Sequence, residues 1–265
     1  MYRPKRRPRL RHPAWVAPCP RSGPMVADDL VLRGATVADL DATAQLHVDQ
    51  LPAGFFPDLG PRFMRRWHRT YLDSPHGVAL VVVCRCDAGG HVYGFLFGSI
   101  DESTHMRAVL TDRRCLLPLA AIAGVSLLRD PPLAARFVRT RARPWTRRLL
   151  GTLTPRPAAP AAATDSAPVA VLAAVAVDPS LRGTGVGARL VERFLNHAHA
   201  GGSATAELVT DASADGAGVF YERLGWAPGR EYRTRDGDRV RSYRHPGVSP
   251  TPRSTFGDER EEGPR

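Results

Sequence analysis

Cysteine, lysine and long apolar runs are all scarce in this chain. Its 265 residues include four cysteines, which form no Cys-x-x-Cys pair and no dense framework. We therefore expect neither a disulfide scaffold nor a metal site, and the reducing cytoplasm is the expected compartment. The longest uncharged, mostly apolar run, residues 115–128, has 14 residues and contains a proline. Because a transmembrane helix needs about 20 apolar residues, this run predicts a buried or partner-facing helix and no membrane span.

The positive charge of the chain is almost entirely arginine and is unevenly placed. Lys5 is the single lysine among 37 basic residues, a bias typical of a GC-rich coding sequence, and the net charge is +11. Seven basic residues and no acidic residue fall in 1–24, and a second basic cluster spans 107–148. The rest of the chain is slightly acidic, so the basic character belongs to two segments and not to the core.

Both ends of the chain have the composition of disordered segments. Residues 1–27 are rich in proline and arginine and lack the apolar core of a secretory signal, so they predict a disordered basic extension. A nucleic-acid-binding arm is the alternative, but no recognised motif or aromatic platform accompanies the arginines, and we expect no specific nucleic-acid partner. Residues 247–265 predict a disordered tail. The folded domain is therefore expected over 28–246.

Between the tails, apolar patterns of strand and helix alternate. Short β-branched runs predict strands at 30–33 and 205–209, and a hairpin of 78–86 and 91–100 joined at the Asp87-Ala-Gly-Gly90 turn. Amphipathic spacing predicts helices from Thr36 to 48, over 63–72, from 187 to about 200 and over 219–224. The run 169–177 predicts a strand buried on both faces. One or two further strands are expected before 244, so the pattern indicates an α/β fold with a mixed sheet.

A segment of about sixty residues, 107–168, separates the third and fourth predicted strands. Its apolar residues recur at helical spacing and are interrupted by Pro118, Pro131, Pro132 and Pro144, which predicts helices broken at those prolines, followed by a Pro/Ala linker. We expect a helical insert that caps a ligand cleft bordered by the third and fourth strands and offers arginines to an acidic or phosphorylated ligand. A dimer interface or a membrane-surface helix is the alternative.

Three glycines, Gly183, Gly185 and Gly187, stand between the 169–177 strand and the following helix. Such a loop directs backbone N–H groups at an anion beside the positive end of a helix dipole, so it predicts a phosphate or pyrophosphate site. A Walker loop is excluded because the chain has no lysine after Lys5. A dinucleotide fingerprint is disfavoured because too few strand–helix units follow, and a glycine loop without a ligand stays an alternative.

The loop and two neighbouring segments resemble one enzyme family. Leu181-Arg-Gly-Thr-Gly-Val-Gly-Ala188 resembles the acetyl-CoA signature (Q/R)-x-x-G-x-(G/A) of the GNAT N-acetyltransferases, and Val219-Phe-Tyr-Glu-Arg-Leu-Gly-Trp226 resembles their second motif. Leu32-Arg-Gly-Ala-Thr-Val-Ala-Asp39 is similar to their opening strand and first helix cap. The resemblance covers about 29–246 apart from the insert. It implies a GNAT-like fold, a central mixed β-sheet flanked by helices.

The resemblance also implies the co-substrate and its contacts. Acetyl-CoA would pair its pantetheine arm with the main chain of the fourth strand and bind its pyrophosphate through the glycine loop. The implied strand residues are Val175, Ala176 and Val177. The implied loop residues are Arg182, Gly183, Thr184, Gly185, Val186, Gly187 and Ala188.

Tyr221 and Glu207 are the catalytic candidates. Tyr221 aligns with the tyrosine that protonates the departing thiolate, and a phenol with a pKa near 10 suits that step. Ala214 stands where the family often has an asparagine, and the 169–177 strand has no carboxylate to act as a base. Glu207 on the neighbouring strand is the remaining choice for the base, followed by Asp101 and His105; a base acting through water stays open.

The acceptor is expected among the first helices and their loop. Phe55 and Phe56 lie in a segment shaped by proline and glycine, and Asp101 follows the third strand at the same cleft, so these three residues are the predicted substrate contacts. The implied activity is acetyl transfer from acetyl-CoA to an amine by direct attack in a ternary complex. The acceptor is a small-molecule or peptide amine, and a homodimer stays open. A non-catalytic acyl-CoA-binding or regulatory module of the same fold is the alternative.

Overall fold

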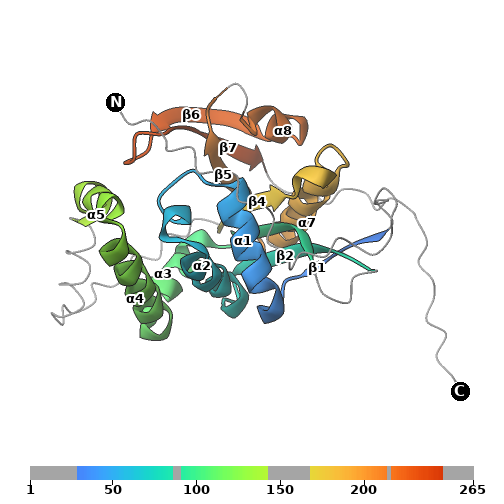
Figure 1. Ribbon diagram of the computed structural model, residues 1–265. Helices are drawn as coiled ribbons and strands as arrows, with labels where there is room; N and C mark the ends of the chain where they lie inside the picture. The colour runs from blue at the N-terminus through green and yellow to red at the C-terminus, as the bar shows by residue number, and fades with distance from the viewer. Residues whose placement is uncertain (1–28, 86–90, 143–167, 214–215, 247–265) are drawn as a thin grey trace, which may run out of the picture.

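A computed structural model describes residues 29–85, 91–142, 168–213 and 216–246. The predicted extensions, the 87–90 turn and nearly all of the Pro/Ala linker lie outside the described residues. Within them, seven strands form one sheet in the order β1-β2-β3-β4-β5-β7-β6 (Figure 1). The strands are β1 Leu30–Gly34, β2 Gly77–Cys84, β3 Val92–Ser99, β4 Val169–Val177, β5 Thr205–Asp211, β6 Ala227–Arg233 and β7 Arg239–Pro246.

The sheet is mixed because one pair of strands, β4 and β5, is parallel while every other pair of neighbours is antiparallel. The crossover between β4 and β5 is the helix α7, Val186–Ala200. This is the α/β fold with a mixed sheet that the sequence predicts. The expected burial of β4 on both faces is wrong at Ala173, which is exposed because a bulge in the β3–β4 pairing leaves it outside the ladder.

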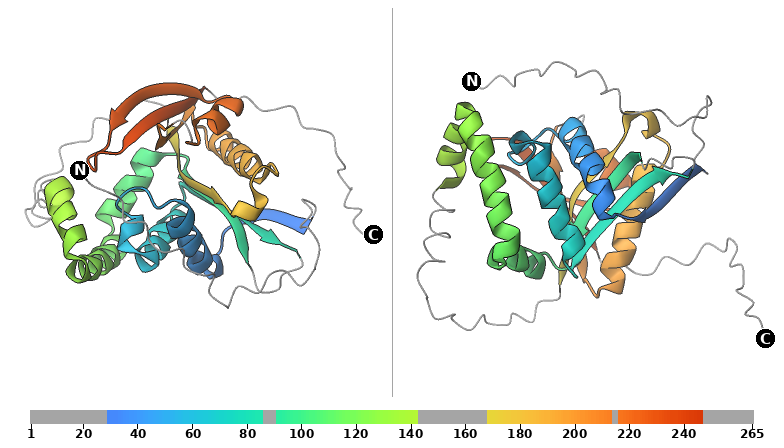
Figure 2. Two further views of the ribbon diagram at one scale, coloured as in Figure 1. Left: turned by 45° about the horizontal axis from the view of Figure 1, so that its top comes forward. Right: turned by 60° about the horizontal axis from the view of Figure 1, so that its bottom comes forward.

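Helices cover both faces of the sheet (Figure 2). Alternate side chains of β3 point to opposite sides: Leu96 packs in one cluster with Leu190 and Phe194 of α7, whereas Phe95 and Phe97 pack in another with α2. That second side is covered by α1, Leu40–Gln50, and α2, Pro61–Asp73. A shorter helix, α8, Gly218–Arg223, precedes β6.

The chain enters α1 through a charged cap that the sequence pattern at Thr36 predicts. Asp39 is 4% exposed and accepts two hydrogen bonds from the Arg33 guanidinium, at 2.8 and 2.9 Å. It also accepts from the backbone N–H and the hydroxyl of Thr36, at 2.7 and 2.8 Å. Burial opposes the charge on Asp39, yet Arg33 and Thr36 together hold the pKa of its carboxyl below the ordinary value. A short 3₁₀ turn, Val37–Asp39, therefore leads into α1.

Between β3 and β4 the described chain is helical. It forms α3, Glu102–Thr111, α4, Arg113–Arg129, α5, Pro131–Phe137, and a π-helical turn, Val138–Ala142. Asp130 caps α5 by accepting from the N–H of Leu133, so the predicted break at Pro131 and Pro132 is correct.

The predicted break at Pro118 is wrong, because α4 runs through this residue. A proline inside a helix leaves the carbonyl four residues earlier without its N–H partner. Here that carbonyl belongs to Arg114, and the guanidinium of Arg66 on α2 donates to it at 2.6 Å. A side chain of a neighbouring helix thus replaces the missing backbone donor, which allows α4 to continue.

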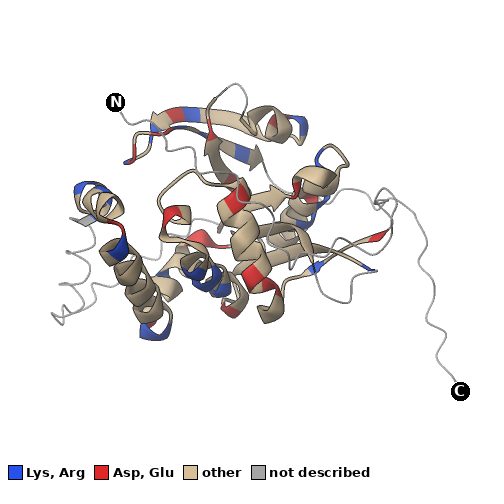
Figure 3. Ribbon diagram, viewed as in Figure 1, with Lys and Arg blue, Asp and Glu red and all other residues tan. Residues whose placement is uncertain are grey.

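Helices α4 and α5 form an outer layer on α2. Leu119 of α4 and Leu133 of α5 share an apolar cluster with Phe63 and Met64 of α2 and with Leu59. The opposite face of α4 leaves Leu117 and Leu128 exposed, and charged residues stand only at the two ends of the helix (Figure 3). No helix in the described ranges is long and apolar enough to cross a bilayer.

A half-buried ion-pair network links this outer layer to the β6–β7 turn. Asp236 in the turn accepts from Arg136 at 2.8 Å and from Arg141 at 2.5 and 2.8 Å. Arg136 also donates to Asp58 at 2.6 Å, and the Arg141 guanidinium lies 4.2 Å from the ring centroid of Phe55. Arg136 and Arg141 therefore link the helical layer to the β6–β7 turn. The sequence predicted that arginines of the insert would bind an acidic ligand, and for these two arginines that prediction is wrong.

Candidate functional site: a glycine loop and an aromatic cavity beside the fourth strand

The glycine loop lies at the end of β4 and opens α7. Gly183 and Gly185 have φ of +80° and +85°, a region that favours glycine. Gly185 is the N-cap of α7, and a Cβ atom placed on either glycine would meet no other atom within 4 Å. The loop therefore presents main-chain N–H groups and the positive end of a helix dipole to open space, an arrangement suited to an anion.

Contacts from two sides fix the position of this loop. The Arg182 guanidinium donates to Gln50 Oε1, at the end of α1, over 2.7 Å. The Thr184 hydroxyl donates to the Leu181 carbonyl, also over 2.7 Å. A Cβ on Gly187 would lie 3.4 Å from Cζ of Phe220, which brings α8 close to the first turn of α7.

Strands β4 and β5 separate halfway along their length. They pair from Val169 with Thr205 to Leu172 with Leu208, and the pairing ends there. Beyond that point β4 continues to Val177 paired with β3, whereas β5 continues paired with β7. The backbone of 173–177 on the β5 side is therefore free to pair with an extended ligand. The separation of the two strands leaves a notch between them at this place.

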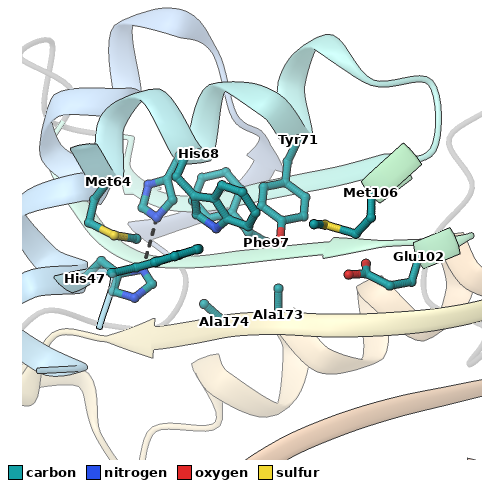
Figure 4. A pocket seen from close by; sticks show the side chains of 11 residues that line it. His47, Met64, His68, Tyr71, Phe97, Glu102, Met106, Ala173 and Ala174 are labelled. Atoms are coloured by element: carbon teal, nitrogen blue, oxygen red, sulfur yellow. Dashed lines mark hydrogen bonds between the residues drawn. The ribbon is translucent and has the colours of Figure 1, made fainter. Parts of the chain in front are cut away.

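A cavity of about 370 Å³ reaches β4 at the point where the two strands separate (Figure 4). Ala173 and Ala174 form its floor, and the other walls come from α1, α2, β3, α3 and the loop before α2. Most of the lining is aromatic or apolar. The lining residues are His47, Phe56, Met64, Trp67, His68, Tyr71, Phe97, Glu102, Met106, Ala173 and Ala174.

Two histidines in the cavity wall form a hydrogen-bonded chain with Thr43. His68 Nδ1 lies 3.1 Å from the Thr43 hydroxyl, which itself donates to the Leu40 carbonyl at 3.2 Å. The order consistent with this bond has His68 Nδ1 donating to Thr43 and His68 Nε2, 3.0 Å from His47 Nδ1, accepting from it. This order leaves His47 Nε2 as a hydrogen-bond acceptor. Burial lowers the pKa of both rings, that of His47 to about 4, so both are neutral at pH 7.

Glu102 places a carboxylate in this apolar cavity. It is the first residue of α3, and its Oε2 accepts from the Ser99 hydroxyl at 2.6 Å. Figure 4 shows the carboxylate directed into the cavity beside Tyr71 and Met106. Burial raises the pKa of Glu102, and the charge of Asp101 adds to this effect, although the bond from Ser99 opposes it. The pKa of Glu102 is therefore raised toward neutral pH, and a general base works best when its pKa lies near the working pH.

Tyr221 lies in the core cluster on the α7 side of the sheet. It is 5% exposed, and its ring makes edge contacts with Phe220 and Trp226 at centroid distances of 5.1 and 5.9 Å. Burial raises the pKa of its hydroxyl, so the phenol keeps its proton at neutral pH.

The other predicted site residues fall in different places. Phe56 lines the cavity, whereas Phe55 packs against Phe137 and under Arg141 in the neighbouring cluster. Asp101 caps α3 by accepting from the Thr104 N–H at 3.0 Å, and hydrogen bonds led by the Thr104 hydroxyl lower its pKa to about 2. Glu207 is half-exposed on β5 and ion-paired with Arg244 of β7 at 2.5 Å, so it lies outside the cavity lining.

Sequence reasoning missed His47, His68 and Glu102 as cavity residues. His47 and His68 lie 21 positions apart on two helices, and their meeting depends on how α1 crosses α2. Glu102 stands next to Asp101, the carboxylate that was expected at the cleft. The signal that would have separated the two is the Asp101-x-x-Thr104 cap pattern, which uses Asp101 for the helix start and turns Glu102 inward. No group of three or more His, Cys, Asp or Glu side chains in the described residues gathers as metal ligands would.

Comparison with known proteins agrees with this arrangement. Residues 148–228 match the model of the acetyltransferase (GNAT) domain, and this segment includes β4, the glycine loop, α7, β5 and α8. The chain therefore carries a domain of the GNAT family of acetyltransferases, as the motifs in its sequence indicate.

Solved structures similar to the chain include several acetyltransferases. The ribosomal-protein-S18-alanine N-acetyltransferase from Escherichia coli is 14% identical, with a TM-score of 0.46, covering 86% of this chain and 99% of that one. Ard1 from Thermoplasma volcanium is 14% identical, with a TM-score of 0.48 and coverages of 83% and 99%. NAA60 from Arabidopsis thaliana, in complex with acetyl-CoA, is 12% identical, with a TM-score of 0.49 and coverages of 82% and 97%. No curated protein matches the chain in sequence.

Proposed function

We propose that this protein is an acetyl-CoA-dependent N-acetyltransferase that acetylates an amine by direct attack in a ternary complex, with 28–246 as its catalytic domain. One observation carries the proposal: the aromatic cavity opens onto β4 at Ala173 and Ala174, where β5 leaves β4. A thioester lying along the free edge of β4 would meet an amine held in the cavity at this point. Proximity of this kind replaces a bimolecular collision with a reaction between oriented groups.

The β4 edge and the glycine loop are suited to the two ends of acetyl-CoA. The main chain of Val175, Ala176 and Val177 has no β5 partner, so it can bind the amides of the pantetheine arm as an added strand would. The space around Gly183 and Gly185 is open, and the first N–H groups of α7, 186–188, have no intrahelical acceptor, which suits the pyrophosphate. The N–H groups of Arg182 and Thr184 already donate to Pro179 and Leu181. The residues assigned to the co-substrate are those of the sequence prediction.

In the proposed reaction the amine nitrogen attacks the thioester carbonyl carbon, and the carbon–sulfur bond breaks as the amide forms. Tyr221 supplies a proton to the departing thiolate. Its hydroxyl holds a proton at neutral pH, as this step requires, while burial raises its pKa and so makes it a weaker acid than an exposed phenol. Phe220, which precedes Tyr221 on α8, lies against Gly187 of the glycine loop and so ties α8 to the co-substrate side.

Glu102 is the proposed acceptor of the proton that the amine loses. Its carboxylate lies in the cavity, and burial raises its pKa toward the range where a base works best. Glu207 stays the alternative from the sequence. The carboxylate of Glu207 accepts hydrogen bonds from Arg244, so this ion pair would have to break before Glu207 could accept a proton from the substrate.

The test is a thiol-release assay with acetyl-CoA and a panel of small amines and peptides, followed by mass spectrometry of the acceptor. An acceptor heavier by one acetyl group, formed together with free CoA, supports the proposal. Binding of acetyl-CoA by calorimetry without thiol release for any amine supports the alternative, a non-catalytic acyl-CoA-binding module. The same protein, examined by sedimentation, shows whether it forms a homodimer.

A further inference from the structure

The cavity walls carry information about the acceptor that neither the fold nor the glycine loop provides. Four rings enclose most of the space. Phe56 and Trp67 meet edge to face at a centroid distance of 4.9 Å, Trp67 and Tyr71 at 5.9 Å, and the Phe97 ring lies 5.7 Å from that of Tyr71. Met64 and Met106 close the remaining sides with flexible, polarizable side chains. Such walls bind a flat apolar body and offer little to a hydroxylated one.

The polar groups in the cavity are few and carry one charge. The imidazoles of His47 and His68 are neutral at pH 7 and use three of their four ring nitrogens on each other and on Thr43. No arginine is among the lining residues, so an acidic or phosphorylated acceptor would find no partner there. The Glu102 carboxylate remains, with Oε2 bonded to Ser99. An ammonium group is the ligand that complements a carboxylate surrounded by aromatic faces.

The size of the space limits the acceptor further. At about 370 Å³ the cavity is at the lower end of the range of small-molecule sites. One carboxylate can neutralise one ammonium, and a second cationic group on the same molecule would have to be buried against rings without a counter-ion. A polycationic amine and a multiply hydroxylated amino sugar are therefore both disfavoured.

Building on the proposed function, we infer that the acceptor is a small primary amine with an aromatic or bulky apolar body, whose ammonium group binds Glu102 while the body packs among Phe56, Trp67 and Phe97. The bound ammonium gives one proton to the Glu102 carboxylate. The resulting neutral amine then attacks the thioester carbon held above Ala173, and the carbon–sulfur bond breaks as the thiolate takes the proton of Tyr221. The nitrogen loses its second proton to solvent as the amide forms, and solvent reprotonates the Tyr221 phenolate.

The first experiment compares acceptors that share a primary amine but differ in the rest of the molecule. We expect kcat/KM for 2-phenylethylamine to exceed that for glucosamine by about 10- to 100-fold, the factor that burial of an aromatic body supplies. A higher kcat/KM for glucosamine, or for a short peptide with an apolar first residue, overturns the inference. Either of those results leaves the proposed acetyltransferase activity intact.

The second experiment measures binding without turnover, so it does not depend on the proposed activity. N,N-dimethyl-2-phenylethylamine carries the same ring and a protonated nitrogen, whereas 2-phenylethanol has the ring and no charge. Calorimetry of the full chain with CoA present should give at least about 10-fold tighter binding for the amine. The difference should disappear in Glu102→Gln and persist in Glu192→Gln, which changes an exposed glutamate on α7. Equal binding of the two ligands to the unaltered protein, or an unchanged preference in Glu102→Gln, overturns the assignment.

Discussion

His68 Nε2 lies 3.0 Å from His47 Nδ1, and the pair joins α2 to α1 inside the wall of the cavity. His68 is in addition stacked on Phe97 at a centroid distance of 4.1 Å. Neither ring faces a carboxylate in this chain of contacts. A second proton on His68 would occupy Nε2 and break the bond from His47, and a second proton on His47 would place a buried charge without a counter-ion. The two histidines therefore have to stay neutral for α1 and α2 to hold this arrangement.

This relationship predicts that the protein loses stability as the pH falls below about 6.5. Because burial lowers the pKa of both histidines in the folded state, the unfolded chain binds more protons between the ordinary value of about 6.5 and the folded value. Stability from this source is present above pH 6.5 and is lost as the pH falls toward 4. Each buried histidine should contribute a loss of about 2 kcal/mol by pH 5.

Urea unfolding of His68→Gln between pH 7 and 5 tests this prediction. Glutamine can donate to Thr43 and accept from His47 without titrating, so its free energy of unfolding should depend less on pH. His199→Gln, which changes an exposed histidine on α7, should keep the pH dependence of the unaltered protein. Parallel pH profiles for the unaltered protein and His68→Gln would contradict the assignment.

Tyr221→Phe should reduce kcat by about 10²–10⁴-fold and leave acetyl-CoA affinity nearly unchanged. The ring that packs against Phe220 and Trp226 is retained, so the melting temperature should change little. Tyr243→Phe is the matched control, because it removes a hydroxyl that donates to Glu222 in the same aromatic cluster. Similar kcat values for the two variants would remove Tyr221 from the proposed mechanism.

Local patterns in the sequence were sufficient for the parts of the fold that depend on neighbours along the chain. The alternation of 78–86 and 91–100 predicts β2 and β3, and the glycines between β4 and α7 have the positive φ that a turn into a helix requires. Thr36 and Asp39 mark the start of the first helical segment for the same reason. Each of these features is decided within a few residues.

Features that depend on distant residues were not predictable in this way. Pro118 ends a helix by local rules, but Arg66, 48 residues from Arg114, supplies the missing donor. The arginines of α5 and the π-helical turn were expected at a ligand, but Asp236, about a hundred residues away, pairs with them. The choice between Asp101 and Glu102 required knowing which carboxylate the helix cap uses.

Gly185→Glu should abolish measurable acetyl-CoA binding while the protein stays folded. The new side chain would stand in open space at the start of α7, where a carboxylate repels the pyrophosphate. Gly202→Glu is the control, because Gly202 also has a positive φ of +75° and open space around it but lies at the other end of α7. Calorimetric affinities reduced equally in both variants would indicate backbone strain and not loss of an anion site.

Asp236→Asn should lower the free energy of unfolding by about 1–3 kcal/mol, because Arg136 and Arg141 would lose their shared carboxylate in a half-buried site. The pKa of Asp236 is lowered to about 2, mainly by Arg141, so this stability is present above about pH 4 and is lost as the pH falls toward 2. Asp73→Asn removes an exposed ion pair with Arg69 and should cost at most about 0.5 kcal/mol. If chemical denaturation gives the same loss of unfolding free energy for Asp236→Asn and Asp73→Asn, the Asp236 network contributes no more than a surface ion pair.

Gly98→Ala should destabilise the protein and disturb the point where β4 and β5 separate. A Cβ atom on Gly98 would lie 2.6 Å from both the Val171 carbonyl oxygen and Cε2 of Phe194, and neither atom can move without shifting β4 or α7. We expect a loss of about 1–3 kcal/mol, the usual range for overpacking a core. Gly124→Ala in α4 meets no atom within 4 Å and should stabilise the protein by up to about 1 kcal/mol through helix propensity. Thermal unfolding of the two variants should therefore move the melting temperature in opposite directions, and a shift of the same sign would mean that the contacts of Gly98 do not set the bulge beside the cavity.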